Sequence, residues 1–169
     1  IHISASEEMT GYNTDSDGAF EAIERGAGFR VEGRRVALLG AGGAARAIAF
    51  GALLRGAAEI RVLNRQAEIE PARELAAALG QAGKNRVKTS AVAFEDVPAA
   101  RQALEDAELV AHATPLGMKD GDPMAVPVDW IARGATVFDA VYTPRRERTP
   151  FLEACERDRG CATVPGLGM

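Results

Sequence analysis

The stretch VALLGAGGAA, residues 36–45, decides the fold. It joins a continuous apolar run that ends in glycine, as expected of a strand buried on both faces, to a segment with helical character. Gly40, Gly42 and Ala45 fill the pattern G-x-G-x-x-A between that strand and that helix. This context predicts a loop that binds a dinucleotide, with the pyrophosphate on the free N–H groups of the helix N-terminus. The alternative is that glycine here merely ends a strand.

Strands and helices alternate on both sides of this loop, and the helical segments are about ten to fifteen residues long, which predicts βαβ crossovers. We expect strands at 34–40, 59–64, 85–92, 108–114, 135–142 and 161–166, and helices at 14–27, 44–56, 70–83, 97–106, 128–134 and 149–160. The predicted fold class is α/β, a doubly wound, mostly parallel, Rossmann-like sheet with helices on both faces.

Composition limits the possible functions. The 169 residues fit one domain, and a net charge of −4 gives no support to a nucleic acid or an anionic membrane as partner. The longest apolar run after the glycine loop, residues 47–54, is too short to span a bilayer. Cys155 and Cys161 lack metal-ligand spacing, so we expect no metal site and two buried thiols in a reducing cytoplasm.

The choice between NAD and NADP is made after the second strand of such a fold, where an acidic residue accepts a hydrogen bond from the ribose of NAD. Here that strand ends in Asn64 and is followed by Arg65, with no acid before Glu68. An arginine at this point pairs with a 2′-phosphate, so NADP is favoured. The alternative is an exposed arginine that only solvates a loop.

Six motifs in order carry a resemblance to one family. They are GYNTD (11–15), GAGGAARAI (40–48), NR (64–65), ATPLGM (113–118), FDAVYTP (138–144) and PGLGM (165–169). In this order and spacing the chain resembles the C-terminal NADP-binding domain of shikimate dehydrogenases. Residues 1–13 then correspond to a tail from the interdomain connection and residues 14–169 to the NADP-binding domain.

The resemblance implies an activity. Shikimate dehydrogenases transfer a hydride between NADP(H) and the C3 carbonyl of 3-dehydroshikimate, forming shikimate on the pathway to chorismate and the aromatic amino acids. Asp15 matches the aspartate that contacts the substrate hydroxyls beside a catalytic lysine, and Tyr142 matches a tyrosine that points at the substrate. Without the resemblance, Asp15 is equally a helix N-cap and Tyr142 a packing residue.

The resemblance also implies the residues that bind the cofactor. Gly40, Ala41, Gly42, Gly43 and Ala44 would hold the pyrophosphate. The other positions are Asn64 and Arg65 at the adenosine phosphate, Thr114 at a strand end, and Ala140, Gly166 and Met169 beside the nicotinamide.

The chain departs from the family pattern at three points. Gln66 replaces a frequent threonine, Arg73 comes late for a second arginine of the phosphate clamp, and His112 stands where asparagine is frequent. We interpret His112 as a hydrogen-bonded residue at a strand end and not as an acid–base group.

The catalytic lysine of the family lies in an N-terminal substrate domain that this chain does not contain. The chain starts at Ile1 and stops after GLGM, so we expect a piece of a longer protein that binds the cofactor but is inactive alone, as monomer or homodimer.

Three alternatives stay open. A quinate/shikimate dehydrogenase using NAD(P) shares these motifs. A non-catalytic homologue that senses a metabolite would keep the fold, although the presence of Asp15 and Tyr142 disfavours it. An unrelated NADP-binding domain, such as that of a methylene-folate dehydrogenase, is disfavoured by the ordered motifs.

Overall fold

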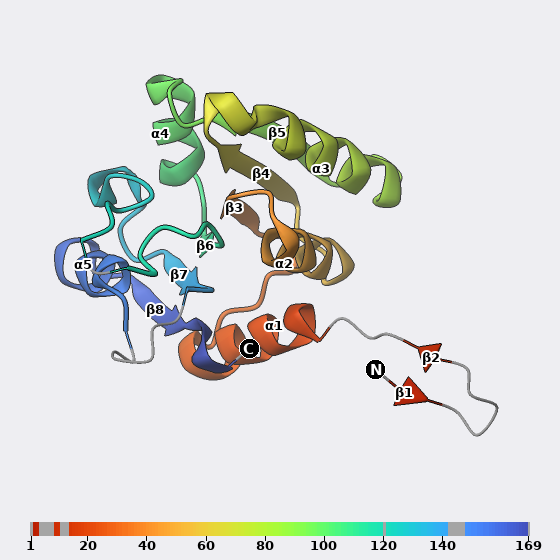
Figure 1. Cartoon of the computed structure of the whole chain (residues 1–169), viewed down its shortest axis with the longest axis horizontal. Coiled ribbons are helices and arrows are strands. Elements are labelled where there is room, and N and C mark those ends of the chain that lie inside the picture. The colour runs from red at the N-terminus through yellow and green to blue at the C-terminus, as the bar shows by residue number, and fades with distance from the viewer. Residues whose placement is uncertain (1, 4–8, 11–13, 120, 142–147, 169) are drawn as a thin grey trace.

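The structure, a computed structural model, describes residues 2–3, 9–10, 14–119, 121–141 and 148–168 (Figure 1). Its centre is a six-stranded parallel sheet with the order β5-β4-β3-β6-β7-β8. The strands are β3 (Arg35–Leu39), β4 (Glu59–Asn64), β5 (Lys88–Ala93), β6 (Leu109–His112), β7 (Thr136–Asp139) and β8 (Ala162–Pro165). From the central strand β3 the chain winds first to one side and later to the other, which confirms the predicted doubly wound α/β class.

Both faces of the sheet are covered, because successive strand residues point to opposite sides. The helices are α1 (Asp15–Ala27), α2 (Gly43–Leu54), α3 (Ile69–Ala82), α4 (Val97–Glu105) and α5 (Pro150–Arg159). In β3, Val36 and Leu38 belong to one core with α1, α2 and α3, whereas Ala37 and Leu39 belong to a second core with α4 and α5. Figure 1 shows these two groups of helices on opposite sides of the sheet.

Local sequence sets the helix ends. The side chains of Asp96 and Thr149 accept backbone N–H groups at the starts of α4 and α5. Gly28 and Gly160 end α1 and α5 in the left-handed conformation. At the start of α1, Thr14 occupies the N-cap position without a side-chain capping bond.

The predicted helix 128–134 was wrong in extent. Only a 3-10 turn, η2 (Val128–Trp130), forms there, and Ile131 is already extended. Ile131 is fully buried in the core beside α4 and α5, and burial of this side chain decides the backbone path over a short segment bounded by Pro127 and Gly134. The strand predicted at 135–142 is likewise shorter and ends at Asp139.

The two thiols behave as the sequence predicts. Cys155 and Cys161 are free and buried on the α5 side of the sheet. Burial raises the pKa of the Cys155 thiol to about 12 and also raises the pKa of Cys161. Both side chains therefore act as small apolar groups at neutral pH.

A short antiparallel pair forms between β1 (His2–Ile3) and β2 (Met9–Thr10), within the segment predicted as a tail. None of the helices in the described ranges has both the length and the apolar character required to cross a membrane.

Candidate dinucleotide site

A hollow of about 480 Å³ lies where the carboxyl ends of β3, β4 and β6 meet. This is the point at which the strand order reverses, the usual place for a ligand in an open α/β sheet. Six residues predicted to bind a cofactor line the hollow, and six others join them. The predicted ones are Gly40, Ala41, Gly42, Asn64, Arg65 and Thr114, and the others are Glu68, Pro71, Phe94, Ala113, Pro115 and Leu116.

Gly40 forms the sharp turn out of β3. Its φ of 104° lies in the region that residues with a side chain rarely adopt. A Cβ added there would lie 2.9 Å from the carbonyl oxygen of Ala113, in the loop that forms the opposite wall. Its N–H donates to the carbonyl of Leu63 at 2.8 Å, which fixes the turn against β4. The glycine therefore lets two walls of the hollow approach each other.

Gly42 leaves the start of α2 open. No atom lies within 4 Å of a Cβ built at Gly42 or Gly43. The N-cap Gly42 offers no side chain to the first turn of α2, and that turn contains no acidic residue. The N–H groups of this first turn have no acceptor within the helix. They can therefore bind an anion, and the positive end of the helix dipole favours the same negative charge. This geometry fits the pyrophosphate of a dinucleotide.

The end of β4 forms the far wall. Asn64 is buried, and its amide is used locally: Oδ1 accepts the N–H of Arg65 at 3.0 Å and Nδ2 donates to the carbonyl of Glu68 at 2.8 Å. The guanidinium of Arg65 pairs with Glu68 Oε1 at 2.7 Å. This hydrogen bond and the charge of Glu68 raise the pKa of Arg65. Asn64 shapes the turn that holds this ion pair at the hollow.

A buried polar chain supports the wall on the β6 side. His112 Nδ1 lies 2.9 Å from Asp139 Oδ1, and His112 Nε2 lies 2.6 Å from the hydroxyl of Thr114. Because the Asp139 carboxylate only accepts, Nδ1 carries the proton, and in the neutral ring Nε2 accepts from Thr114. Thr114 in turn accepts the N–H of Leu116 at 3.2 Å. These hydrogen bonds confirm that His112 is a hydrogen-bonded residue at a strand end, and they orient the side chain of Thr114.

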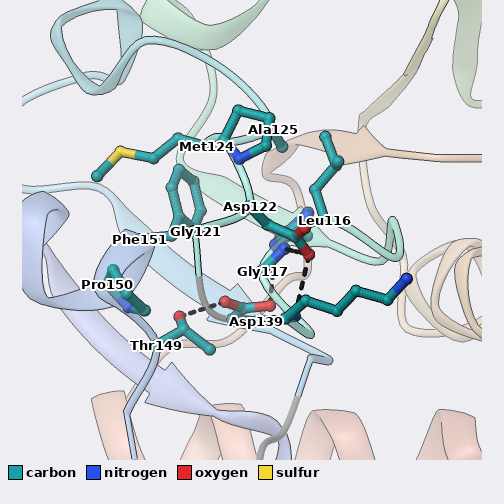
Figure 2. Close-up of a pocket in the computed structure, with 13 residues that line it drawn as sticks. Leu116, Gly117, Gly121, Asp122, Met124, Ala125, Asp139, Thr149, Pro150 and Phe151 are labelled. Atoms are coloured by element: carbon teal, nitrogen blue, oxygen red, sulfur yellow. Dashed lines mark hydrogen bonds and ion pairs between the residues drawn. The ribbon is translucent and has the colours of Figure 1, made fainter.

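Asp139 is the hub of this chain. Besides His112 it accepts the N–H of Val141 at 3.0 Å and the hydroxyl of Thr149, the N-cap of α5, at 2.5 Å. Figure 2 shows the Thr149 hydroxyl directed at the Asp139 carboxylate. These contacts tie the ends of β6 and β7 to the start of α5.

A second hollow of about 170 Å³ opens beside this hub, between residues 116–119 and 121–125 on one side and the start of α5 on the other (Figure 2). Its other carboxylate, Asp122, accepts the N–H groups of Gly117 and Lys119 at 3.1 and 3.0 Å. The hydrogen bonds of the Asp122 carboxylate therefore stabilise the loop in which this residue lies. Within the described residues, no group of three or more His, Cys, Asp or Glu side chains is placed to hold a metal.

Four other predicted site residues, Gly43, Ala44, Ala140 and Gly166, are not among the residues that line the main hollow. Gly43 and the half-buried Ala44 follow Gly42 into α2, and Ala140 follows β7. Gly166 follows β8, where an added Cβ would lie 2.7 Å from the carbonyl oxygen of Asp139, so close packing alone demands glycine there. Tyr142 and Met169 lie outside the described residues.

Asp15 is the first residue of α1 and is not among the residues that line the hollow. Its neighbours face α2: an added Cβ at Gly51 would meet the hydroxyl of Ser16, and Asp17 pairs with Arg55 at 2.7 Å.

Sequence reasoning missed Pro71 and Phe94, which add apolar walls at the β4 end of the hollow. Phe94 directly follows β5, and β5 pairs with β4 in register from Lys88 to Ala93. The alignment of parallel strand ends was the signal that points to it.

A glycine turn and an open helix N-terminus at the switch point of this sheet define a dinucleotide-binding domain of the Rossmann type. No protein-family model matches the chain. The chain is 40% identical over 162 residues to the shikimate dehydrogenase (NADP(+)) of Moorella thermoacetica, covering 95% of this chain and 52% of that one.

Solved structures agree. A shikimate 5-dehydrogenase from Listeria monocytogenes, in complex with shikimate and NAD, superposes with a TM-score of 0.82 at 31% identity, over 94% of this chain and 54% of that one. A quinate dehydrogenase from Corynebacterium glutamicum, in complex with NAD, gives a TM-score of 0.82 at 27% identity, over 98% and 55%.

The predicted resemblance is confirmed: the chain is a homologue of the shikimate dehydrogenases and matches their cofactor-binding half. It spans about half the length of the curated relatives that it matches.

Proposed function

We propose that this chain is the NADP(H)-binding domain of an enzyme that interconverts 3-dehydroshikimate and shikimate. The observation that carries the proposal is the hollow at the switch point, which brings together the glycine loop, the open start of α2 and Arg65. The names of the relatives supply the reaction and the cofactor. When bound, NADP(H) supplies or accepts the hydride.

In this proposal the residues of the chain bind and orient. The N–H groups at the start of α2 hold the pyrophosphate, Arg65 faces the 2′-phosphate of the adenosine ribose, and Thr114 contributes to the wall on the β6 side. Ala140, Gly166 and Met169 belong to the nicotinamide side, as the resemblance implies.

The substrate roles rest on the resemblance. We assign to the carboxylate of Asp15 the task of orienting the reacting hydroxyl and of holding the ammonium of a lysine from a second, substrate-binding domain. Tyr142 points its hydroxyl at the substrate in the same assignment. Residues 1–13 then form the connection to that second domain, and residues 14–169 form the cofactor domain.

The same proposal assigns the protein to the cytoplasm, where free buried thiols such as Cys155 and Cys161 are the rule. It makes shikimate or 3-dehydroshikimate the substrate and leaves monomer or homodimer as the assembly. A quinate substrate is the second candidate, favoured by the likeness to the quinate dehydrogenase. Comparison of kcat/KM for quinate and shikimate in a protein with both domains separates the two.

The 169-residue chain is expected to bind NADPH and to show no turnover of shikimate, since the second domain supplies the lysine. Titration of NADPH fluorescence with the chain measures the first part, and absorbance at the NADPH band measures the second. Absence of NADPH binding contradicts the cofactor role. Robust turnover by the chain alone contradicts the assignment of the lysine to another domain.

In a protein that contains both domains, Asp15→Asn is expected to lower kcat by roughly 100-fold or more, because proton transfer at the substrate loses its positioned carboxylate. Asp17→Asn on the same helical turn is the matched control, since Asp17 pairs with Arg55 on the surface. An Asp15→Asn enzyme with the kcat of the control makes Asp15 a purely structural residue.

A further inference from the structure

The β4 end of the hollow contains an ion pair in place of a free arginine. The Arg65 guanidinium and the Glu68 carboxylate both line the hollow and are joined at 2.7 Å, with more than half of each side chain exposed. The Asn64 amide holds the backbone of both residues in one turn. A ligand that reaches this end therefore meets the anionic as well as the cationic partner.

The charged side chains around the Arg65–Glu68 pair do not make this end of the hollow more favourable for an anion. Glu95 lies on the same side, where its carboxylate accepts the N–H of Gln66 at 2.8 Å. Arg73 pairs with Glu70 along α3, and neither of them lines the hollow. One guanidinium and one carboxylate therefore line this end of the hollow, and the carboxylate of Glu95 lies beside the backbone of Gln66.

A ribose 2′-phosphate and a ribose 2′-hydroxyl respond to this arrangement in opposite ways. The phosphate must compete with Glu68 for Arg65 and is repelled by the carboxylate. The hydroxyl donates a hydrogen bond to a carboxylate, as it does in NAD-binding domains.

We propose that Glu68 sets the cofactor preference of this chain: it occupies Arg65 and accepts the ribose hydroxyl of NAD(H), so that NAD(H) binds nearly as well as NADP(H). This inference rests on the proposed function, because it deepens the assignment of the same hollow to a dinucleotide. It adds Glu68 as the residue that determines specificity between the two nicotinamide cofactors.

The test is fluorescence titration of the 169-residue chain with NADPH and with NADH, for the parent and for Glu68→Gln. The parent is expected to bind the two with dissociation constants within about tenfold of each other. In Glu68→Gln, NADPH binds more tightly and NADH more weakly, so the ratio of the two constants shifts about tenfold toward NADPH.

Glu70→Gln is the matched control, because it removes the same charge from an arginine pair on α3 that does not line the hollow. Its ratio is expected to stay within about twofold of the parent ratio. Melting curves of the three proteins show whether each is folded.

The outcomes separate the two proposals. If the parent binds neither dinucleotide, the proposed function fails and this inference fails with it. If both dinucleotides bind but Glu68→Gln leaves their ratio unchanged, or Glu70→Gln shifts it equally, only the role of Glu68 is overturned. A parent that already prefers NADPH by much more than tenfold also overturns it.

Discussion

Gly40→Ala is expected to cost about 1–3 kcal/mol of folding stability from backbone conformation alone, because a residue with a side chain must adopt a φ of 104°. The added methyl group also lies 2.9 Å from the carbonyl oxygen of Ala113, so residues 113–114 must move away from the glycine loop. The wall of the hollow moves with them, and NADPH binding should be lost. Urea unfolding measures the stability, and fluorescence titration below the unfolding transition measures the binding.

Gly42→Ala separates stability from binding. Gly42 has a φ of −76°, and an added Cβ meets no atom within 4 Å. Loss of glycine at the N-cap should cost at most about 1 kcal/mol. The methyl group stands where a pyrophosphate approaches α2, so NADPH affinity should fall about tenfold or more. Parent-like affinity in Gly42→Ala argues against the pyrophosphate position, and parent-like stability in Gly40→Ala argues against the turn.

Asp139→Ala is expected to destabilise the fold by about 3–5 kcal/mol, because removal of this fully buried carboxylate leaves three hydrogen-bond donors without an acceptor. The donors are His112 Nδ1, the Val141 N–H and the Thr149 hydroxyl. Loss of the hub also releases Thr114 through His112, so cofactor binding should weaken in the fraction that stays folded. Chemical unfolding followed by circular dichroism provides the free energy.

Asp158→Ala is the control for removal of an acidic side chain, here one in the last turn of α5. Asp158 pairs with Arg157 at 2.7 Å, with about half of its own side chain exposed, so its removal should change the free energy of unfolding only slightly. A free-energy loss for Asp139→Ala no larger than that of the control means that the buried chain adds little to the stability of the fold.

The alternation of strands and helices could be predicted from sequence because buried parallel strands read as short apolar runs between turn residues. The segment 59–64 has the predicted bounds, and β3 and β6 lie within the predicted runs. The helix predicted at 128–134 failed because seven residues carry little intrinsic helical stability, and the burial of Ile131 decides their conformation.

Some features of the site could likewise be predicted from the sequence, and others could not. Gly40 and Gly42 could be identified because their roles depend on backbone geometry, which a short motif encodes. The pairing of Arg65 with Glu68, and of His112 with Asp139, depends on rotamers and on contacts between strand ends. The sequence shows only that Glu68 is an acidic residue close to Arg65. It does not show that His112 and Asp139, which lie on different strands, are in contact.

The order of the strands also determines when the hollow can form during folding. The central ladder pairs Val36 with Leu109, two residues from opposite halves of the chain. Contacts between residues so far apart in sequence form late in folding, because the long loop between them must close before the contacts can stabilise the structure. A nascent polypeptide therefore exposes its glycine turn well before the facing segment exists, and a nucleotide can stabilise the finished domain without guiding its assembly.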